Sequence, residues 1–192
     1  NIWNIQIFQN ILNISRLVIS NKNIDLNLYK PKEIPDLIKW DFRKEKGYKI
    51  GVILYRSLFK ANDIQFAKEL NKKIRKHGYS PITIWVNSLK NDLIQKEILN
   101  IFNEQSIKAI ITTTSFSSNR SNETEVAKQF WDILEIPVFQ ILVSTSSYRS
   151  WKNSYLGLNS IDLTLQVVMP EIDGRITTRP CAFKESSTSN NL

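Results

Sequence analysis

The feature that most restricts the fold of this chain is a regular alternation of short apolar runs and amphipathic segments between residues 47 and 143. Each apolar run is rich in β-branched residues, as expected for a strand that is buried on both faces of a sheet. The amphipathic segments carry apolar residues at helical spacing, and the first is followed by a glycine suited to ending a helix. The runs are Lys49–Tyr55, Pro81–Val86, Ile107–Thr112 and Pro137–Val143, and the predicted helices between them are Asp63–Lys76, Asp92–Asn103 and Glu123–Leu134.

This alternation predicts an α/β fold of the flavodoxin or Rossmann type. Strands that are separated by helices pair in parallel through right-handed crossovers, so we expect a parallel sheet of about four strands with helices on both faces. Residues 1–46 predict a mainly helical segment followed by a linker that contains Pro31 and Pro35. We expect the α/β domain to occupy residues 47–184 and residues 185–192 to begin a further segment.

The composition excludes several classes of function. Cys181 is the only cysteine and His77 the only histidine, which excludes disulfide frameworks, zinc clusters and Cys–His pairs within the chain. Every apolar run is far shorter than the roughly 20 residues that span a bilayer, so no membrane contact is expected and a cytoplasmic location is predicted. The net charge of +8 is scattered, and its densest cluster, Lys68 to Lys76, is typical of a solvated helix face. Nucleic acid is therefore not an expected partner.

Polar residues follow the predicted strands at the edge where parallel sheets bind ligands. The candidate substrate-binding residues are Arg56, Ser57, Asn62, Ser88, Lys90 and Ser144. Hydroxyl groups and cations in such positions suit a ligand that carries carboxylates. Each of these side chains could instead cap a following helix.

A helix is predicted to begin at Ser160 and to end at Pro170, before a turn at Asp173-Gly174. An extended run then follows from Arg175 to Lys184.

Five blocks of sequence, in order, closely resemble the large subunit of cobaltochelatase, in the family that it shares with the large subunit of magnesium chelatase. The resemblance covers residues 48–184. The residues that follow Gly174, from Arg175 to Arg179 and then Phe183-Lys184, resemble the cobalt branch of the family, since the magnesium branch continues with a second Gly and Met-Glu-Pro. The blocks are Gly51–Ser57, Trp85–Lys90, Pro137–Leu142, Trp151 with Leu156–Leu158, and Pro170–Arg175.

The resemblance implies a subunit that holds a tetrapyrrole and the metal, while separate AAA+ ATPase subunits hydrolyse ATP. It implies Co²⁺ as the substrate metal and hydrogenobyrinic acid a,c-diamide as the corrin substrate. The chain has no Gly-rich phosphate-binding loop, which agrees with ATP being bound by the partner subunits. The family subunit is several times longer, so we expect a fragment that is inactive alone.

Metal insertion requires a base for the inner N–H protons of the macrocycle and a hard oxygen ligand for the ion, and a carboxylate serves both purposes. Glu171 and Asp173 are the candidate catalytic residues, and Glu171 is also the candidate metal ligand. If their segment is extended, the two side chains project to the same side. Arg175 could pair with a peripheral carboxylate of the macrocycle. Alternatively, Asp173-Gly174 is only a turn.

Trp151 has two interpretations, because its indole either stacks on the macrocycle or belongs to the core. Two other functions stay open. One is a magnesium chelatase subunit that inserts Mg²⁺ into protoporphyrin IX, and the other is a non-enzymatic α/β module that binds a small polar ligand.

Overall fold

The computed structural model describes residues 15, 34–43, 45–115 and 130–185. The chain divides into two compact units, residues 1–35 and 36–192, and all elements below belong to the second unit. Apart from Ser15, the mainly helical segment predicted before the linker lies outside the described residues. The same holds for residues 186–192 and for most of the predicted helix Glu123–Leu134.

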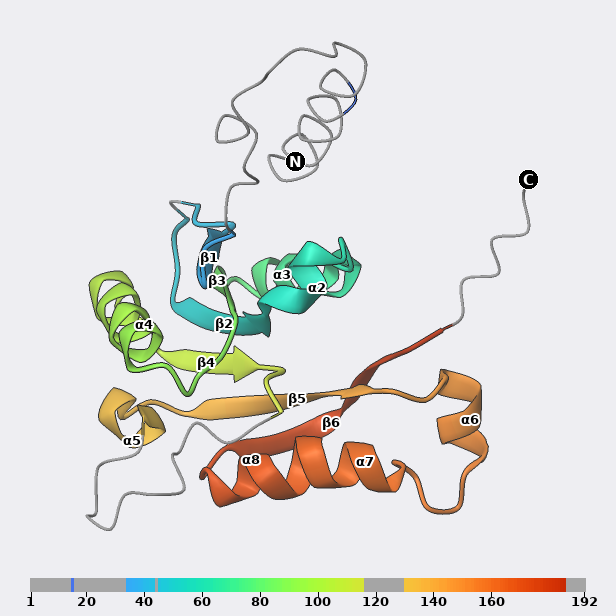
Figure 1. Cartoon of the computed structure of the whole chain (residues 1–192). Coiled ribbons are helices and arrows are strands. Elements are labelled where there is room, and N and C mark those ends of the chain that lie inside the picture. Colours follow the sequence, from blue (N-terminus) through green and yellow to red (C-terminus); the bar gives the residue numbers. More distant parts are fainter. Residues whose placement is uncertain (1–14, 16–33, 44, 116–129, 186–192) are drawn as a thin grey trace. The chain divides into compact units, whose positions relative to one another are not determined.

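Within the described residues, six strands form one sheet in the order β1-β3-β2-β4-β5-β6 (Figure 1). β1 pairs antiparallel with β3, and all other neighbours are parallel. The predicted α/β fold is therefore confirmed. The strands are β1 Leu37–Trp40, β2 Lys49–Tyr55, β3 Ser80–Val86, β4 Ala109–Thr112, β5 Val138–Ser144 and β6 Ile176–Phe183.

The sheet contains two strands, β1 and β6, in addition to the predicted four. β1 lies inside the predicted linker and is only four residues long. Its register is set by its pairing with β3, whose edge would otherwise be open. β6 forms from the extended run after Arg175 and lies at the opposite edge of the sheet. Pro180 is tolerated within β6 because an edge strand need not donate every backbone N–H.

Helices connect the strands and cover the sheet. The described helices are α2 Arg56–Lys60, α3 Gln65–Lys76, α4 Asp92–Gln105, α5 Phe130–Leu134, α6 Tyr148–Asn153, α7 Ser160–Leu163, the π-helical turn η2 Thr164–Val168, and α8 Met169–Ile172.

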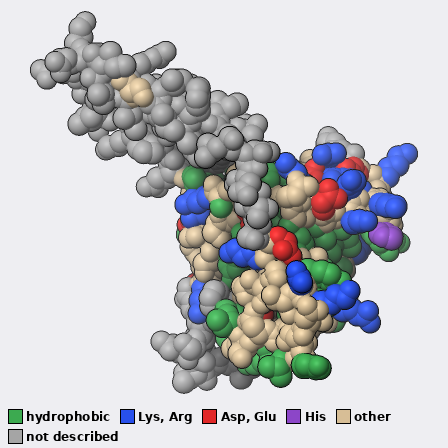
Figure 2. Space-filling view, turned by 90° about the vertical axis from the view of Figure 1, so that its right-hand side faces the viewer, with side chains coloured by type: hydrophobic (Ala, Val, Ile, Leu, Met, Phe, Trp, Pro, Cys, Tyr) green, Lys and Arg blue, Asp and Glu red, His purple; other side chains and the backbone are tan. Residues whose placement is uncertain are grey.

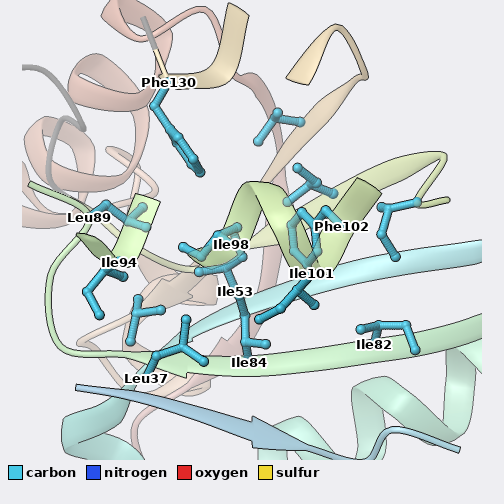
Figure 3. Close-up of a cluster of buried hydrophobic side chains, with 14 of the residues drawn as sticks. Leu37, Ile53, Ile82, Ile84, Leu89, Ile94, Ile98, Ile101, Phe102 and Phe130 are labelled. Atoms are coloured by element: carbon cyan, nitrogen blue, oxygen red, sulfur yellow. The ribbon is translucent and has the colours of Figure 1, made fainter. Parts of the chain in front are cut away.

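The two faces of the sheet are packed by different helices. On one face, Ile53 and Ile84 meet Phe102 of α4 and Phe130 of α5 in the main hydrophobic cluster (Figure 3). Successive strand residues point to opposite faces, so Thr83 and Trp85 face the other side. There Thr83 hydrogen-bonds to Asn71 of α3, and Trp85 contacts Phe59 of α2. Helices thus cover both faces, as predicted.

A close contact between α4 and the sheet depends on Gly51. A Cβ atom on this residue would lie 2.7 Å from Cζ of Phe102, which is closer than carbon atoms approach in proteins. The absence of a side chain lets the Phe102 ring lie directly on β2, where it is only 2% exposed. Burying a ring of this kind stabilises a fold by about 1.5–3 kcal/mol.

The segment from residue 160 to 172 is one helix that consists of α7, η2 and α8 in succession. Its N-cap is Asn159 and not the predicted Ser160, because the Asn159 side chain accepts the backbone N–H of Asp162 at 2.8 Å. The helix also continues through Pro170. In η2 the Met169 N–H bonds to the carbonyl of Thr164, five residues earlier, so the bonding pattern has already shifted where Pro170 lacks a donor.

This helix buries polar side chains and exposes apolar ones. Asp162 and Gln166 are 1% and 6% exposed, whereas Ile161 and Ile172 are 65% and 64% exposed. Four-residue spacing puts Asp162 and Gln166 on the same side of the helix. That side faces β5, because Gln166 exchanges two hydrogen bonds with the Val143 backbone, at 2.6 and 2.7 Å.

Candidate functional site

The carboxyl ends of the parallel strands lie together at one end of the sheet, on the side where α2 and α6 begin (Figure 1). β3 and β4 flank β2 on opposite sides, so the direction of winding reverses at β2. In open α/β sheets, ligands bind beyond the carboxyl ends of the strands at such a reversal. This end of the sheet is therefore the expected position of a ligand site.

The residues predicted after β2 and β3 lie at this end of the sheet, and their surroundings differ. Arg56 is 9% exposed and pairs with Asp36, with Nη1 and Oδ1 3.0 Å apart. Ser57 and Asn62 are exposed. The Ser88 hydroxyl accepts the backbone N–H of Lys90 at 3.1 Å, and Lys90 itself is exposed. Ser88 thus stabilises a local turn, whereas the N-cap of α4 is Asn91.

Ser144, at the end of β5, belongs to a buried network centred on Asp162. The Ser144 hydroxyl donates to Asp162 Oδ2 at 2.8 Å, and the backbone N–H of Thr145 donates to the same oxygen at 2.8 Å. Asn159 donates to Oδ2 at 3.0 Å, and Gln166 donates to Oδ1 at 3.1 Å. A buried carboxylate that receives four hydrogen bonds from neutral groups locks the end of β5 to the helix that follows.

The Asp162 network was not predicted from the sequence. A signal for it exists, because Asp162 and Gln166 stand four residues apart in a helix that is rich in apolar residues. That spacing places both polar groups on one face, where they need partners if the face is buried.

A pocket of about 470 Å³ opens beside this network, between α6, the loop 154–159 and the first turn of α7. Four serines (Ser146, Ser150, Ser154 and Ser160) contribute to its lining, together with Trp151, Asn159 and leucine side chains. Figure 2 views the molecule from the side on which the parallel strands end, and its lower part is mostly uncharged, with hydrophobic side chains along the lower border. We call this cavity the serine pocket.

Glu171 and Asp173 lie at the opposite end of the sheet, because they precede β6 and β6 runs parallel to β5 (Figure 1). Their segment is not extended. Glu171 belongs to α8, Asp173 is its C-cap, and Gly174 ends the helix with a φ of 72°. The Arg175 N–H bonds to the Pro170 carbonyl at 3.0 Å, which closes a helix-terminating turn. The condition for a common direction of the two carboxylates, an extended segment, is therefore not met.

The two carboxylates have different surroundings. Glu171 is exposed, and its Oε1 accepts the hydroxyl proton of Thr177 at 3.0 Å. Asp173 is 1% exposed, and its Oδ2 accepts hydrogen bonds from Arg175 Nη2 at 2.7 Å and from the Trp131 indole at 3.3 Å. Only Glu171 can meet a ligand or a metal ion from outside.

Arg175 is enclosed by protein groups. Its Nη1 donates to the Thr114 carbonyl at 2.5 Å and to Gln140 Oε1 at 2.9 Å, and its Cζ lies 4.9 Å from the centre of the Trp131 ring. Burial lowers the pKa of Arg175 below its ordinary value, while the hydrogen bond and the charge of Asp173 act in the opposite direction. Its donors point at protein acceptors, which argues against the predicted pairing with a ligand carboxylate.

In residues 34–43, 45–115 and 130–185, no group of three or more His, Cys, Asp or Glu side chains is arranged to hold a metal ion. No helix in the described part of the chain is long and apolar enough to cross a membrane.

Comparison with known proteins gives consistent results. A family model described as CobN/Magnesium Chelatase matches residues 16–192. An uncharacterized protein of Methanocaldococcus jannaschii is 35% identical over 146 residues, which are 71% of this chain and 12% of that protein. The aerobic cobaltochelatase subunit CobN of a Sinorhizobium species is 28% identical over 138 residues, or 72% of this chain and 11% of that subunit.

A solved structure shares the fold. The catalytic subunit of cobaltochelatase from Mycobacterium tuberculosis matches with a TM-score of 0.70 and 22% identity, over 90% of this chain and 15% of that subunit. The chain thus spans only 11% to 12% of the length of the curated relatives above. The resemblance seen in the sequence is confirmed by the family model across nearly the whole chain, and the chain belongs to the CobN/magnesium chelatase family.

Proposed function

We propose that this chain is part of the large subunit of an ATP-dependent cobaltochelatase. The subunit would hold hydrogenobyrinic acid a,c-diamide while Co²⁺ is inserted during cobalamin biosynthesis in the cytoplasm, and partner AAA+ subunits would hydrolyse ATP. The observation that carries the proposal is the family match over residues 16–192. The similarity to subunits named aerobic cobaltochelatase favours cobalt over magnesium.

Within this chain, Glu171 is the residue that we assign to the chemistry. Its carboxylate is exposed, and the Thr177 hydroxyl holds one oxygen at 3.0 Å, which leaves the other oxygen for an incoming group. A carboxylate in this position can accept a proton that leaves an inner nitrogen of the macrocycle, or can hand over a hard cation that it binds only weakly. Asp173 would act on the fold through Arg175 and would not touch the substrate.

The substrate assignment is tested by titrating the full-length subunit with hydrogenobyrinic acid a,c-diamide and, separately, with protoporphyrin IX. Visible absorbance reports both bound macrocycles. Tighter binding of the corrin supports the cobalt assignment, whereas tighter binding of protoporphyrin IX would favour the magnesium alternative. Co²⁺ insertion should also require ATP and the ATPase subunits, and insertion without them would contradict the proposal.

The assignment of Glu171 is tested with Glu171→Gln in the full-length subunit. We expect Co²⁺ insertion to slow by about a hundredfold, a typical effect for the loss of a general base, while the Kd for the corrin stays within about twofold. Glu104→Gln is the matched control, because Glu104 is an exposed glutamate on α4. Equal insertion rates for the two variants would remove Glu171 from the mechanism.

A further inference from the structure

The serine pocket has a lining without formal charge. Serine hydroxyls, one asparagine amide, one indole and leucine side chains form its wall, and none of the described side chains that line it is Lys, Arg, His, Asp or Glu. A ligand group that carries a full charge would lose hydration here without gaining an opposite charge. The pocket therefore suits an uncharged polar group.

The protein already uses the serine oxygens as acceptors. Ser146 Oγ accepts from the Asn159 amide at 3.0 Å, Ser150 Oγ accepts from the Ser147 hydroxyl at 3.0 Å, and Ser154 Oγ accepts from the Leu156 N–H at 3.2 Å. A hydroxyl group has one proton and two lone pairs, so each of these serines keeps its proton and one lone pair for a ligand.

Residues outside the pocket fix the positions of the side chains that line it. The Asn159 amide donates to Asp162 Oδ2 at 3.0 Å, and Asp162 is anchored to Ser144 at the end of β5. On the other wall, the Trp151 ring lies 5.0 Å from the ring of Phe183 in β6, measured between centroids. A pocket with a fixed wall needs little reorganisation when a ligand binds.

The hydrogen-bond donors and acceptors that line the serine pocket indicate which ligand group it suits. A primary carboxamide offers one carbonyl acceptor and two N–H donors, which match hydroxyl groups that can each donate and accept. A carboxylate offers acceptors only, and its charge would stay uncompensated in this pocket. The indole and the leucine side chains suit the methylene and ring edge that carry such a group.

We propose that the serine pocket binds a carboxamide side chain on the rim of the tetrapyrrole. This inference rests on the proposed function. A cavity of about 470 Å³ lies near the small end of the range for ligand sites, so it takes one edge of a macrocycle and not the whole ring. The pocket thereby distinguishes an amidated edge of the macrocycle from an edge that carries free carboxylates.

The test uses the full-length subunit with Ser150→Ala/Ser154→Ala. Both serines are exposed, so the substitutions remove two hydroxyl groups and leave the packed core intact. The variant is titrated with hydrogenobyrinic acid a,c-diamide and with hydrogenobyrinic acid, which carries carboxylates in place of the two carboxamides. We expect the Kd for the diamide to rise about tenfold, as for the loss of two neutral hydrogen bonds, and the Kd for the acid to change less than about twofold.

Asn103→Ala, an exposed polar residue on α4, is the control for a change away from the pocket, and unfolding midpoints of all variants verify the fold. An unchanged Kd for the diamide would overturn the proposed site, and equal losses for both ligands would overturn its preference for carboxamides. Both outcomes leave the proposed function standing. A wild-type subunit that prefers protoporphyrin IX, or that binds no tetrapyrrole, would overturn the proposed function together with the pocket.

Discussion

Arg175 Nη2 and Asp173 Oδ2 lie 2.7 Å apart, and the side chains of both residues are completely buried. The same guanidinium donates to Gln140 on β5 and to the Thr114 carbonyl after β4. One cation therefore joins the start of β6 to two other parts of the sheet, and one carboxylate balances its charge.

Removal of this carboxylate should destabilise the fold strongly. Asp173→Ala leaves a buried guanidinium without its counter-charge, for which we expect a loss of about 3–5 kcal/mol in the free energy of unfolding. Asp173→Ala/Arg175→Met should lose less than the single variant, because it removes both charges. Urea denaturation measures both effects, with Glu104→Ala as an exposed control. A loss below about 1 kcal/mol for Asp173→Ala would show that solvent reaches Arg175.

Asp162→Asn tests the network at the end of β5. The carboxylate receives hydrogen bonds from Ser144, Thr145, Asn159 and Gln166, so an amide NH₂ in its place directs a donor at other donors. We expect a loss of about 1–3 kcal/mol in the free energy of unfolding. Faster hydrogen exchange of the Thr145 amide should accompany it. Full stability of the variant would mean that the network contributes little to the fold.

Gly51→Ala should be destabilising because of the Phe102 ring. The added methyl group would lie 2.7 Å from Phe102 Cζ, and overpacking of this kind costs about 1–3 kcal/mol. Gly51→Ala should cost less stability in the Phe102→Leu background than in the wild-type protein, because the smaller leucine side chain leaves room for the methyl group. Thermal unfolding of the four proteins completes the double-mutant cycle. Independent effects of the two substitutions would argue against the contact.

The Cys181 thiol should react slowly. Cys181 is an exposed residue, but its Sγ lies in a partly buried position near the Leu142 carbonyl. Burial of the thiol raises the pKa of Cys181 from its ordinary 9.0 to about 11, so the folded protein keeps the proton to higher pH than the unfolded chain does. At pH 8 the folded protein then holds roughly a hundredfold less thiolate than the unfolded chain, and the thiolate is the reactive form. Alkylation by iodoacetamide should be correspondingly slower in the folded state and should accelerate as the pH rises toward 11. Equal rates in urea and in buffer would contradict this.

Much of the sheet could be predicted because its strands carry their own signal. The run Lys49–Tyr55 coincides with β2, and the helix predicted from Asp92 to Asn103 ends two residues before α4 does. Local apolar pattern and helix caps determine these elements. β1 has no such signal, since the pairing of Leu37–Trp40 depends on β3, more than forty residues later in the chain.

The candidate site was harder to predict because its contacts are distant in sequence. Nothing near Arg175 shows that Gln140 and Thr114 will enclose it, and its partners lie 35 and 61 residues away. The direction of Glu171 depended on whether residues 169–172 are helical or extended. Pro170 was predicted to end the helix, but the shifted hydrogen bonds of η2 let the helix continue to Ile172. The predicted turn at Asp173-Gly174 does form.

The π-helical turn η2 also sets the rotational register of the helix. On an ideal α-helix, residues four apart drift around the axis by about 40°, so Asp162, Gln166 and Pro170 would wind away from a straight line. A π-turn holds more residues per turn and reverses this drift, and all three residues are buried. If residues 164–168 adopted ordinary α-helical geometry at unchanged length, everything beyond them would rotate by roughly a quarter of a turn relative to Asp162. Glu171 would then face a new direction although its own sequence neighbours are unchanged.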